Sequence, residues 1–323
     1  MKKTKSDARS LKPFAKGRGV SFQAFMQQTV DWLSQMGKNG TAATYRTALS
    51  SFMRFCDHRE VPMEAISSDL MLHYESWLRN QGICKNCSSA YMRSLRSVYN
   101  RAVDSGLIPQ KHPFLHVYTG VDKTAKRAVS LETIRSLKNL DLADRPGLAF
   151  ARDLFMFSFY TRGMAFVDMA FLKHSDIRDG YLCYVRRKTG QQLCIRWEEC
   201  MQTTVDQLFE HAAHHACKER NISFLLPIIR KSGNQWQQYK SCQRLVNHHL
   251  KTISTMIDAT ADIPLTMYVA RHSWASIARS KDIPLSVISE ALGHNNEQTT
   301  QIYLGSLETS RIDEANRKII GFL

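Results

Sequence analysis

The sequence predicts a mainly α-helical protein of two domains with one small β-hairpin, and three observations lead to this prediction. Apolar residues recur every three or four positions through most of the chain, which is the spacing of a helix that buries one face. Two short β-rich runs, 181–186 and 192–197, flank a glycine-containing turn, as in a hairpin. The 323 residues, 43% of them hydrophobic, exceed what one core usually fills, so we expect two domains.

Residues 18–108 are expected to form a compact domain of four helices. Ser21 can cap the first helix, because a serine side chain accepts a hydrogen bond from the free amides of a first turn, and Thr41 can cap the second. The third helix is expected over 68–80. The fourth is expected over 88–104 and ends just before a glycine.

Residues 109–127 contain two prolines and a glycine and show no helical period, so we expect an interdomain linker there. Residues 128–323 are expected to form the second domain, in which further helices follow the hairpin. These helices are expected over 199–218, 237–257, 266–280, 284–292 and 310–322.

The charge of the chain favours a polyanionic partner. Lys and Arg total 44 against 29 Asp and Glu, a formal net charge of +15, and nucleic acid is the simplest such partner. A merely basic soluble enzyme is the alternative. Residues 1–17 form a basic arm, expected to be either a flexible phosphate-seeking segment or an ordinary solvated terminus. The arginines of the helical domain predicted to meet DNA phosphates are Arg46, Arg93, Arg96 and Arg101.

Several other classes are disfavoured. No apolar run reaches the ~18–20 residues that a membrane helix needs, and the first residues do not have the pattern of a secretory signal. Eight cysteines are too few for a disulfide scaffold, so we expect reduced thiols in a cytoplasm. No metal site is predicted, because Cys84 and Cys87 have no second pair. His211, His214 and His215 likewise have no supporting acid or cysteine.

Five residues of the second domain are of the types needed for attack on a phosphodiester without metal. They are Arg162, Lys188, Arg271, His294 and Tyr303, which lie in the stretches 160–177, 186–190, 265–278 and 291–304. Two arginines can each donate bidentate hydrogen bonds to the non-bridging oxygens of a phosphate. A lysine on a turn can protonate the departing 5′ oxygen, and a tyrosine can form a covalent phosphotyrosine.

A tyrosine nucleophile needs help from its surroundings. A phenol with a pKa of about 10 is only ~0.1% ionised at pH 7, which is a deficit of roughly 4 kcal/mol. Neighbouring cations can offset this deficit, since one donor aimed at the developing charge is commonly worth ~10²–10³ in rate. His294, nine residues before Tyr303, is predicted to position the phosphate or to assist proton transfer.

The order and spacing of these residues carry a resemblance to a known family. Leu-Gly-His at 292–294 is followed nine residues later by a tyrosine, 23 residues separate Arg271 from His294, and Lys-Thr-Gly follows a predicted strand. The chain resembles the tyrosine site-specific recombinases of the phage integrase family. The resemblance implies a C-shaped clamp around double-stranded DNA, made of a helical SAM-like core-binding domain and a catalytic domain.

The resemblance also implies the reaction and the assembly. Strands are cut and rejoined at specific sites through a 3′-phosphotyrosyl intermediate, with no metal or nucleotide cofactor, and the outcome is inversion, integration or excision of DNA. The active assembly is a homotetramer in a synaptic complex that passes through a Holliday junction. The free protein is expected to be a monomer in the cytoplasm of a prokaryote, beside the nucleoid.

Two positions depart from the family pattern. When Asp168 is aligned with the acid of the first-arginine block, Ala165 falls at the arginine position and Arg162 lies three residues earlier. Three residues is close to one helical turn, so we expect Arg162 to reach the same phosphate and Asp168 either to support the site or to belong to the core. Tyr268 replaces the histidine of the family's H-x-x-R, and we expect it to orient the phosphate rather than to accept the proton of Tyr303.

Two other functions stay open at this point. A catalytically inactive DNA-binding regulator would keep the fold without the chemistry, and a type IB topoisomerase-like enzyme would use the same nucleophile to relax supercoils. The helix expected over 310–322 ends in apolar residues. In related recombinases such a tail docks on a neighbouring protomer, and packing within its own chain is the alternative.

Overall fold

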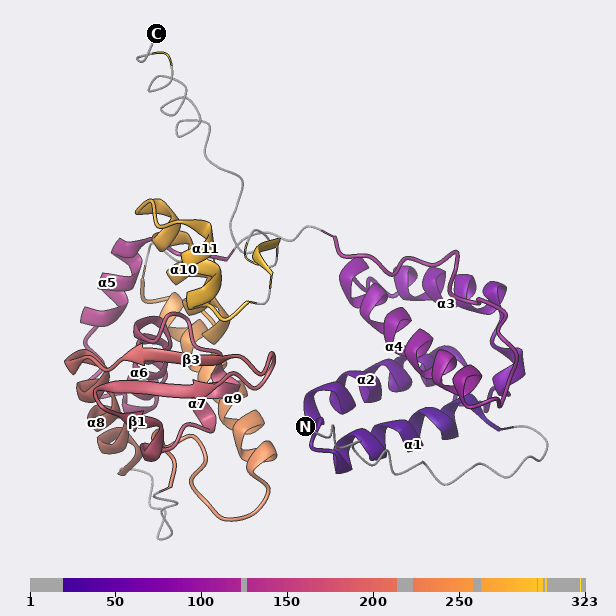
Figure 1. Ribbon diagram of the computed structural model, residues 1–323, viewed down its shortest axis with the longest axis horizontal. Coiled ribbons are helices and arrows are strands. Elements are labelled where there is room, and N and C mark those ends of the chain that lie inside the picture. The colour runs from indigo at the N-terminus through magenta and orange to yellow at the C-terminus, as the bar shows by residue number, and fades with distance from the viewer. Residues whose placement is uncertain are drawn as a thin grey trace, which may run out of the picture. The chain divides into compact units, whose positions relative to one another are not determined.

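The computed structural model describes residues 20–122, 127–213, 223–257, 263–294, 296–298, 300 and 320 (Figure 1). Its chain divides into two compact units, Met1–Thr124 and Ala125–Leu323. In these described ranges no helix has both the length and the apolar character needed to cross a membrane.

The first unit packs its helices around an aromatic core. Its described elements are α1 (Phe22–Gln35), α2 (Asn39–Phe55), the short 3₁₀ helix η1 (Met63–Ala65), α3 (Ser68–Asn80) and α4 (Lys85–Asp104). Phe22, Phe52 and Tyr74 are fully buried, and the Phe52 ring meets the other two edge-on at centroid distances of 5.6 and 5.3 Å. Edge-to-face packing suits the charge distribution of aromatic rings, so α1, α2 and α3 converge on one well-defined contact.

The helix ends of this unit follow local capping chemistry where a capping side chain exists. The Ser21 hydroxyl accepts an amide of the first turn of α1 at 3.4 Å, as predicted, and α3 covers its predicted span. α2 begins at Asn39, two residues before the predicted cap Thr41, and α4 begins at Lys85, three residues earlier than predicted. Neither start has a side-chain cap, so the pattern of capping residues could not reveal it.

Residues 109–122, which belong to the expected linker, pack along the first unit. Phe114 and Val117 are buried in the same apolar cluster as the helices. The Tyr118 amide donates to the Glu75 carboxylate on α3 at 2.8 Å. The prolines and the glycine therefore mark a stretch without regular structure, but not one without tertiary contacts.

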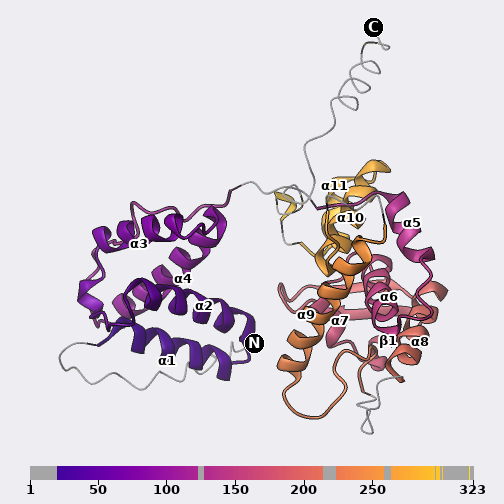
Figure 2. The ribbon, with the colours of Figure 1, turned by 180° about the vertical axis from the view of Figure 1, so that it is seen from behind.

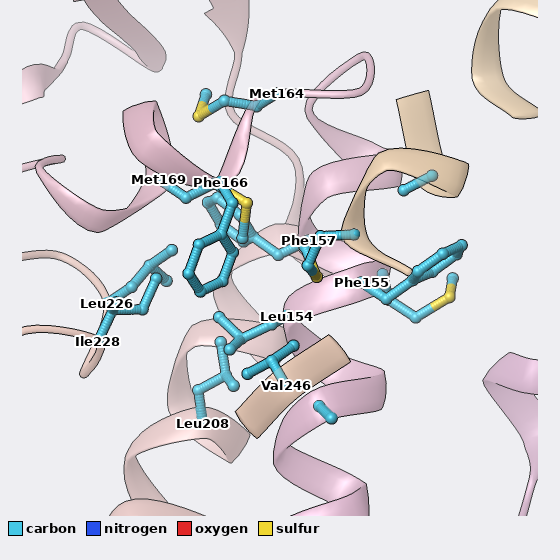
Figure 3. Packing of buried hydrophobic residues seen from close by; sticks show 14 of the residues in the cluster. Leu154, Phe155, Phe157, Met164, Phe166, Met169, Leu208, Leu226, Ile228 and Val246 are labelled. Carbon is cyan, nitrogen blue, oxygen red and sulfur yellow. The ribbon is translucent and has the colours of Figure 1, made fainter. Parts of the chain in front are cut away.

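The second unit is built around one apolar helix. Its described elements are α5 (Leu131–Asn139), α6 (Pro146–Tyr160), α7 (Phe166–Ala170), η2 (His174–Asp176), β1 (Ile177–Arg178), β2 (Tyr181–Val185), β3 (Gln192–Arg196), α8 (Glu199–Ala213), α9 (Gln235–Ser254), α10 (Met267–Ser280) and α11 (Leu285–Ala291). α6 contacts α8, α9 and α10, and Figure 2 shows these helices grouped around it. In Figure 3, Leu154 and Phe157 of α6 lie near Leu208 of α8 and Val246 of α9. A helix that is apolar on nearly every side is stable only when surrounded in this way.

The predicted hairpin is confirmed and belongs to a three-stranded antiparallel sheet of order β1-β2-β3. Leu182 pairs with Ile195, and both are buried, whereas Tyr181 and Val185 on the other face of β2 are exposed. Strand β1, of two residues, was not predicted, because so short a strand leaves no alternating pattern.

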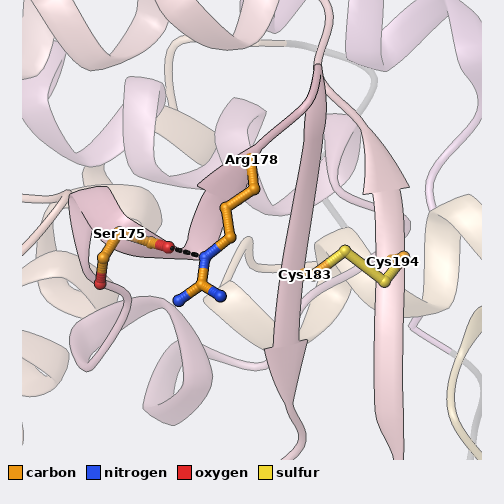
Figure 4. Close-up of a disulfide and its surroundings, with 4 residues drawn as sticks. All are labelled: Ser175, Arg178, Cys183 and Cys194. Atoms are coloured by element: carbon orange, nitrogen blue, oxygen red, sulfur yellow. Dashed lines mark hydrogen bonds between the residues drawn. A yellow bond between two sulfur atoms is a disulfide. The ribbon is translucent and has the colours of Figure 1, made fainter.

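Cys183 and Cys194 form a disulfide between β2 and β3 (Figure 4), so the expectation that the thiols are reduced is wrong for this pair. The two residues are directly opposite each other in the strand register, with their Cα atoms 4.2 Å apart. This is the closer of the two kinds of antiparallel pair, in which the side chains approach best. Spacing in the sequence does not reveal that register. Figure 4 also shows Arg178 Nε donating to the carbonyl of Ser175 at 2.8 Å.

The helices predicted over 266–280 and 284–292 are confirmed as α10 and α11, and α9 covers most of the span predicted over 237–257. The helix predicted over 199–218 is α8 as far as Ala213. The helix predicted over 310–322 lies outside the described residues except at Ile320, which is helical.

Candidate active site

Arg271 lies at the centre of the site, on the first turns of α10. Its side chain is buried, with 4% exposed. Nη1 donates to the Gly163 carbonyl at 2.8 Å, and Nη2 donates to the Leu292 carbonyl and to Nε2 of His294, the latter at 3.0 Å. One guanidinium therefore joins the turn after α6 to the turn after α11. A planar group with five donors in a fixed fork is suited to this.

The turn after α6 must contain a glycine at position 163. Gly163 has a φ of +71°, in the left-handed region that other residues avoid. A Cβ atom built on it would lie 2.6 Å from the Cα of Arg271, which is closer than van der Waals contact allows. The glycine therefore permits both the turn and the close approach of α10 that brings Arg271 to the Gly163 carbonyl.

His294 is buried and neutral. Because a guanidinium only donates, Nε2 of His294 is the acceptor of the bond from Arg271, and Nδ1 carries the proton and donates to the Thr300 hydroxyl at 2.8 Å. Burial, together with the positive charges of Arg271, Arg186 and Lys188, lowers the pKa of His294 to about 4. At neutral pH the ring therefore holds Arg271 in place without adding charge.

Arg186 follows β2 directly and was not singled out by the sequence. Its side chain is buried, with 5% exposed, and Nη1 donates to the Gly293 carbonyl. The alternation of β2 gives the signal that identifies it: Leu182 and Tyr184 face the core, so residue 186 faces the core as well. In the Arg-Arg pair of the turn, the first arginine is therefore inside and the second, Arg187, is exposed.

Lys188 is exposed on the turn between β2 and β3, as predicted for a lysine on the hairpin. Its charge contributes to the lowered pKa of His294, so it lies within electrostatic reach of that ring. The turn and residues 292–294 are in direct contact at Gly293, whose φ is +64°. A Cβ there would meet Leu193 at 2.9 Å and the Arg186 side chain at 3.1 Å. The structure thus brings the hairpin, α10 and the Leu-Gly-His block together.

Arg162 lies on a turn, not on a helix. α6 ends at Tyr160 and α7 begins at Phe166, and Arg162 has a φ of +61° between them. The premise that Arg162 lies one helical turn from position 165, on nearly the same face, is therefore wrong, because the left-handed turn at Arg162 and Gly163 interrupts the helix. Arg162 is half-exposed and lies next to the glycine that accepts from Arg271, so its closeness to the site comes from that neighbour.

Asp168 contacts the backbone of the hairpin from the interior of the unit. It is 4% exposed, and Oδ1 accepts the backbone amide of Arg187 at 2.9 Å. Burial raises the pKa of Asp168, whereas the Arg187 amide and the charges of Arg186, Arg271 and Arg187 oppose that rise. Of the two roles expected for Asp168, the contact with the hairpin backbone favours support of the site.

The remaining predicted site residues are Tyr268 and Tyr303. Tyr268, one turn before Arg271 on α10, is 54% exposed and packs edge-on against His272 with ring centroids 4.6 Å apart. Tyr303 lies outside the described residues.

The arginines predicted to bind DNA lie on the first unit. Arg46 on α2 and Arg93 on α4 are exposed. Arg96 donates to a threonine hydroxyl at 3.3 Å, and Arg101 lies over the Trp32 ring at 4.2 Å. Arg93, Arg96 and Arg101 line one cavity of about 440 Å³. The three are therefore grouped on one surface, although Arg101 also has a partner within the protein.

The residues set aside as metal ligands gather no third partner in the described part of the chain. Cys84 and Cys87 have their sulfur atoms 3.0 Å apart at the start of α4. His211 contacts the buried Asp153 through Nε2 at 3.1 Å. The other two histidines of that group, His214 and His215, lie outside the described residues.

Comparison with known families identifies the class of protein that has this fold and this cluster of buried arginines. Residues 144–309 match the model of the phage integrase family, and residues 21–117 match that of the phage integrase SAM-like domain. The chain belongs to the phage integrase family, and the predicted resemblance to tyrosine recombinases is confirmed.

The chain is also similar to individual tyrosine recombinases. The tyrosine recombinase XerD of Pseudomonas aeruginosa is 24% identical over 277 residues, which cover 84% of this chain and 88% of the relative. The tyrosine recombinase XerC of Halalkalibacterium halodurans is 24% identical over 268 residues, which cover 81% of this chain and 86% of the relative.

Solved structures show the same fold. A lambda integrase tetramer bound to a Holliday junction aligns with a TM-score of 0.62 and 16% identity, over 90% of this chain and 80% of that one. The Tn1549 transposon integrase in complex with transposon right end DNA aligns with a TM-score of 0.61 and 11% identity, over 92% of this chain and 99% of that one. The predicted fold class, mainly helical with a small sheet, is confirmed.

Proposed function

We propose that the protein is a site-specific recombinase that cuts and rejoins DNA through a covalent bond between Tyr303 and a 3′ phosphate. The observation that carries this proposal is the buried guanidinium of Arg271, held by Gly163, Leu292 and His294 in a chain of the phage integrase family. A buried, rigidly held cation is suited to stabilise the negative charge that develops on a phosphate under attack.

The proposed reaction has two reversible steps. The phenol of Tyr303 gives up its proton to solvent and its oxygen bonds to phosphorus. The bond to the 5′ oxygen breaks, and Lys188 supplies the proton that the departing 5′ oxygen takes up. The 5′ hydroxyl of a second strand then attacks the phosphotyrosine and releases Tyr303. Arg162 and Arg271 hold the non-bridging oxygens, with Tyr268 orienting the phosphate. No free energy source is needed, because the phosphotyrosine conserves the energy of the broken bond.

His294 serves this reaction by position and not as the base. With a pKa of about 4 and Nε2 already bonded to Arg271, its ring has little affinity for the proton of Tyr303. Of the two roles expected for His294, the structure favours the positioning of Arg271 and the phosphate.

The partners follow from the class of protein. The proposed substrate is double-stranded DNA carrying specific recombination sites, contacted on the first unit by Arg46, Arg93, Arg96 and Arg101. The active assembly is a homotetramer on two sites, as the lambda integrase in the Holliday-junction structure is a tetramer. The protein acts in the cytoplasm, where the chromosome is accessible, and is a monomer when free. The outcome is inversion, integration or excision.

The test uses DNA from inverted repeats that flank the gene, with a nick placed so that a short fragment diffuses away after cleavage and leaves the covalent complex trapped. The wild-type protein is expected to form an adduct that resists denaturation. The Tyr303→Phe variant is expected to form none. A persistent adduct in that variant would show that another residue is the nucleophile.

The same preparations separate the two alternatives. Relaxation of supercoiled plasmid without preference for the repeats would support a topoisomerase-like enzyme. Binding to the repeats with neither adduct nor relaxation would support a regulator. Neither alternative is favoured by the comparisons, in which the curated relatives are tyrosine recombinases.

A further inference from the structure

The guanidinium of Arg186 is buried in the active site without a direct ion pair, and the buried Asp168 interacts with its charge only at longer range. Its side chain is 5% exposed, and no carboxylate lies within 4.0 Å of it among the described residues. Burial of a charge without a partner costs several kcal/mol in typical proteins. A group kept in such a position needs either a structural reason or a ligand.

A structural role accounts for only part of the Arg186 side chain. Nη1 donates to the Gly293 carbonyl, which helps to hold the Leu-Gly-His block. Nε is buried and has no hydrogen-bond acceptor among the described residues. Nε and Nη2 form one edge of the guanidinium fork, and this edge matches two oxygens of a phosphate. Nε thus lacks the acceptor that an oxygen of an anion would supply.

The surroundings of Arg186 also favour an anion. Its charge, together with those of Arg271 and Lys188, lowers the pKa of His294. The two buried guanidinium groups bond successive carbonyls, Arg271 that of Leu292 and Arg186 that of Gly293, so both are fixed by the same turn. Three cations therefore converge around a neutral imidazole, and a phosphate is the ligand whose charge and oxygens fit them.

We infer that Arg186 binds the scissile phosphate of DNA as a further catalytic arginine, supplying from the hairpin the buried charge that Ala165 cannot supply from the first-arginine block. This inference rests on the proposed recombinase function. Arg162 differs from Arg186 because it is only partly buried and lies on a turn. Burial raises the pKa of Tyr184 and the charges of both arginines oppose that rise, so both lie near the inner face of the hairpin.

The test compares Arg186→Gln with a matched neighbour, Arg187→Gln. Glutamine removes the charge and ends at about the place of Nε, so it also loses the contact with the Gly293 carbonyl. The guanidinium of Arg187 lies over the Phe171 ring on the outside. Each variant is assayed for covalent adduct on the nicked DNA with a normal scissile phosphate. A second substrate carries a methylphosphonate there, which replaces one charged oxygen by a methyl group.

Arg186→Gln is expected to lose ~10²–10³-fold in cleavage of the phosphate substrate, the usual effect of removing one charge-stabilising donor. On the methylphosphonate, which has no charge to neutralise, its rate is expected to come within about tenfold of wild type. Arg187→Gln is expected to follow wild type on both. Normal cleavage of phosphate by Arg186→Gln overturns the inference. An equal loss on both substrates also overturns it, because Arg186 then only holds Gly293.

A binding measurement without chemistry completes the test. In the Tyr303→Phe background, replacing the scissile phosphate by methylphosphonate is expected to weaken DNA binding, and the added Arg186→Gln change is expected to reduce that difference, since Arg162 and Arg271 still contact the phosphate. An undiminished difference in the double variant overturns the inference. Arg186→Lys, which keeps the charge, and thermal unfolding of each variant identify misfolding. Failure of wild type to form any adduct counts against the proposed function, and the binding result still decides the role of Arg186.

Discussion

The two units differ in what they bury. In the described part of the first unit the buried polar side chains are serine, threonine and glutamine, and every charged residue lies at least partly at the surface. In the second unit Asp153, Asp168, Arg186, Arg271 and His294 are buried. Burying an ionisable side chain is costly unless it is paired or has a function. Because such residues are buried only in the second unit, we assign catalysis to that unit.

The largest expected effect comes from Arg271. In Arg271→Gln the Gly163 and Leu292 carbonyls and His294 lose their donor, at roughly 1–3 kcal/mol for each buried group left unpaired. Cleavage is expected to fall ~10²–10³-fold or more. Urea unfolding and the covalent-adduct assay measure the two losses. The exposed Arg196 provides the control, since its surface ion pair with Glu198 is worth about 0–1 kcal/mol.

The next effect tests the packing that permits the site. Gly163→Ala places a Cβ 2.6 Å from the Arg271 backbone at a φ of +71°, and a loss of roughly 2–5 kcal/mol is expected together with reduced cleavage. Gly180→Ala is the matched control, because its φ is +75° but no atom lies within 4 Å of the added Cβ. The control is expected to lose only about 1 kcal/mol. Equal losses in thermal or urea unfolding would mean that the contact with α10 is not tight.

Acid is expected to act through His294. Its pKa is about 4 in the folded protein against about 6.5 when unfolded, so below about pH 6.5 the unfolded chain takes up the proton first. Stability from this group is complete above pH 6.5 and falls as the pH approaches 4, by about 1–2 kcal/mol at pH 5. Asp168, with its raised pKa, opposes this trend. The difference between wild type and His294→Gln in urea unfolding from pH 7 to 5 isolates the histidine, and identical slopes would contradict the assignment.

The smallest effect belongs to the first unit. Ser21→Ala removes the side-chain cap of α1, and a loss of about 1 kcal/mol is expected. Cleavage per folded molecule is expected to stay unchanged, because no charged group is disturbed. A drop in cleavage at full folding would show that the helical unit takes part in the chemistry and would weaken the contrast between the units.

Local rules predicted the parts of the fold that depend on neighbouring residues. Ser21 predicted a helix start, and the two β-rich runs on either side of a glycine-containing turn predicted the hairpin. Contacts between distant segments could not be predicted in this way. The disulfide depends on the register of two strands, and the failure of the helical premise for Arg162 depends on the turn at Gly163.

The candidate site was likewise predicted only in part. Arg271, Lys188 and His294 were found because their types and spacing are distinctive, and the structure brings them together. Arg186 was missed because two adjacent arginines look alike in a sequence, and only the inward face of β2 distinguishes them. The role of Tyr303 stays a prediction.

The Leu-Gly-His block has a consequence for how such chains are recognised. The carbonyl of Leu292 receives Arg271, Gly293 leaves room for the hairpin, and the ring of His294 steadies the guanidinium from the other side. Each residue of the block thus has a structural role. A related protein that had lost its nucleophile would still need all three residues to stay folded. The Leu-Gly-His signature therefore identifies the fold, and only the tyrosine at position 303 distinguishes a cleaving enzyme from an inactive one.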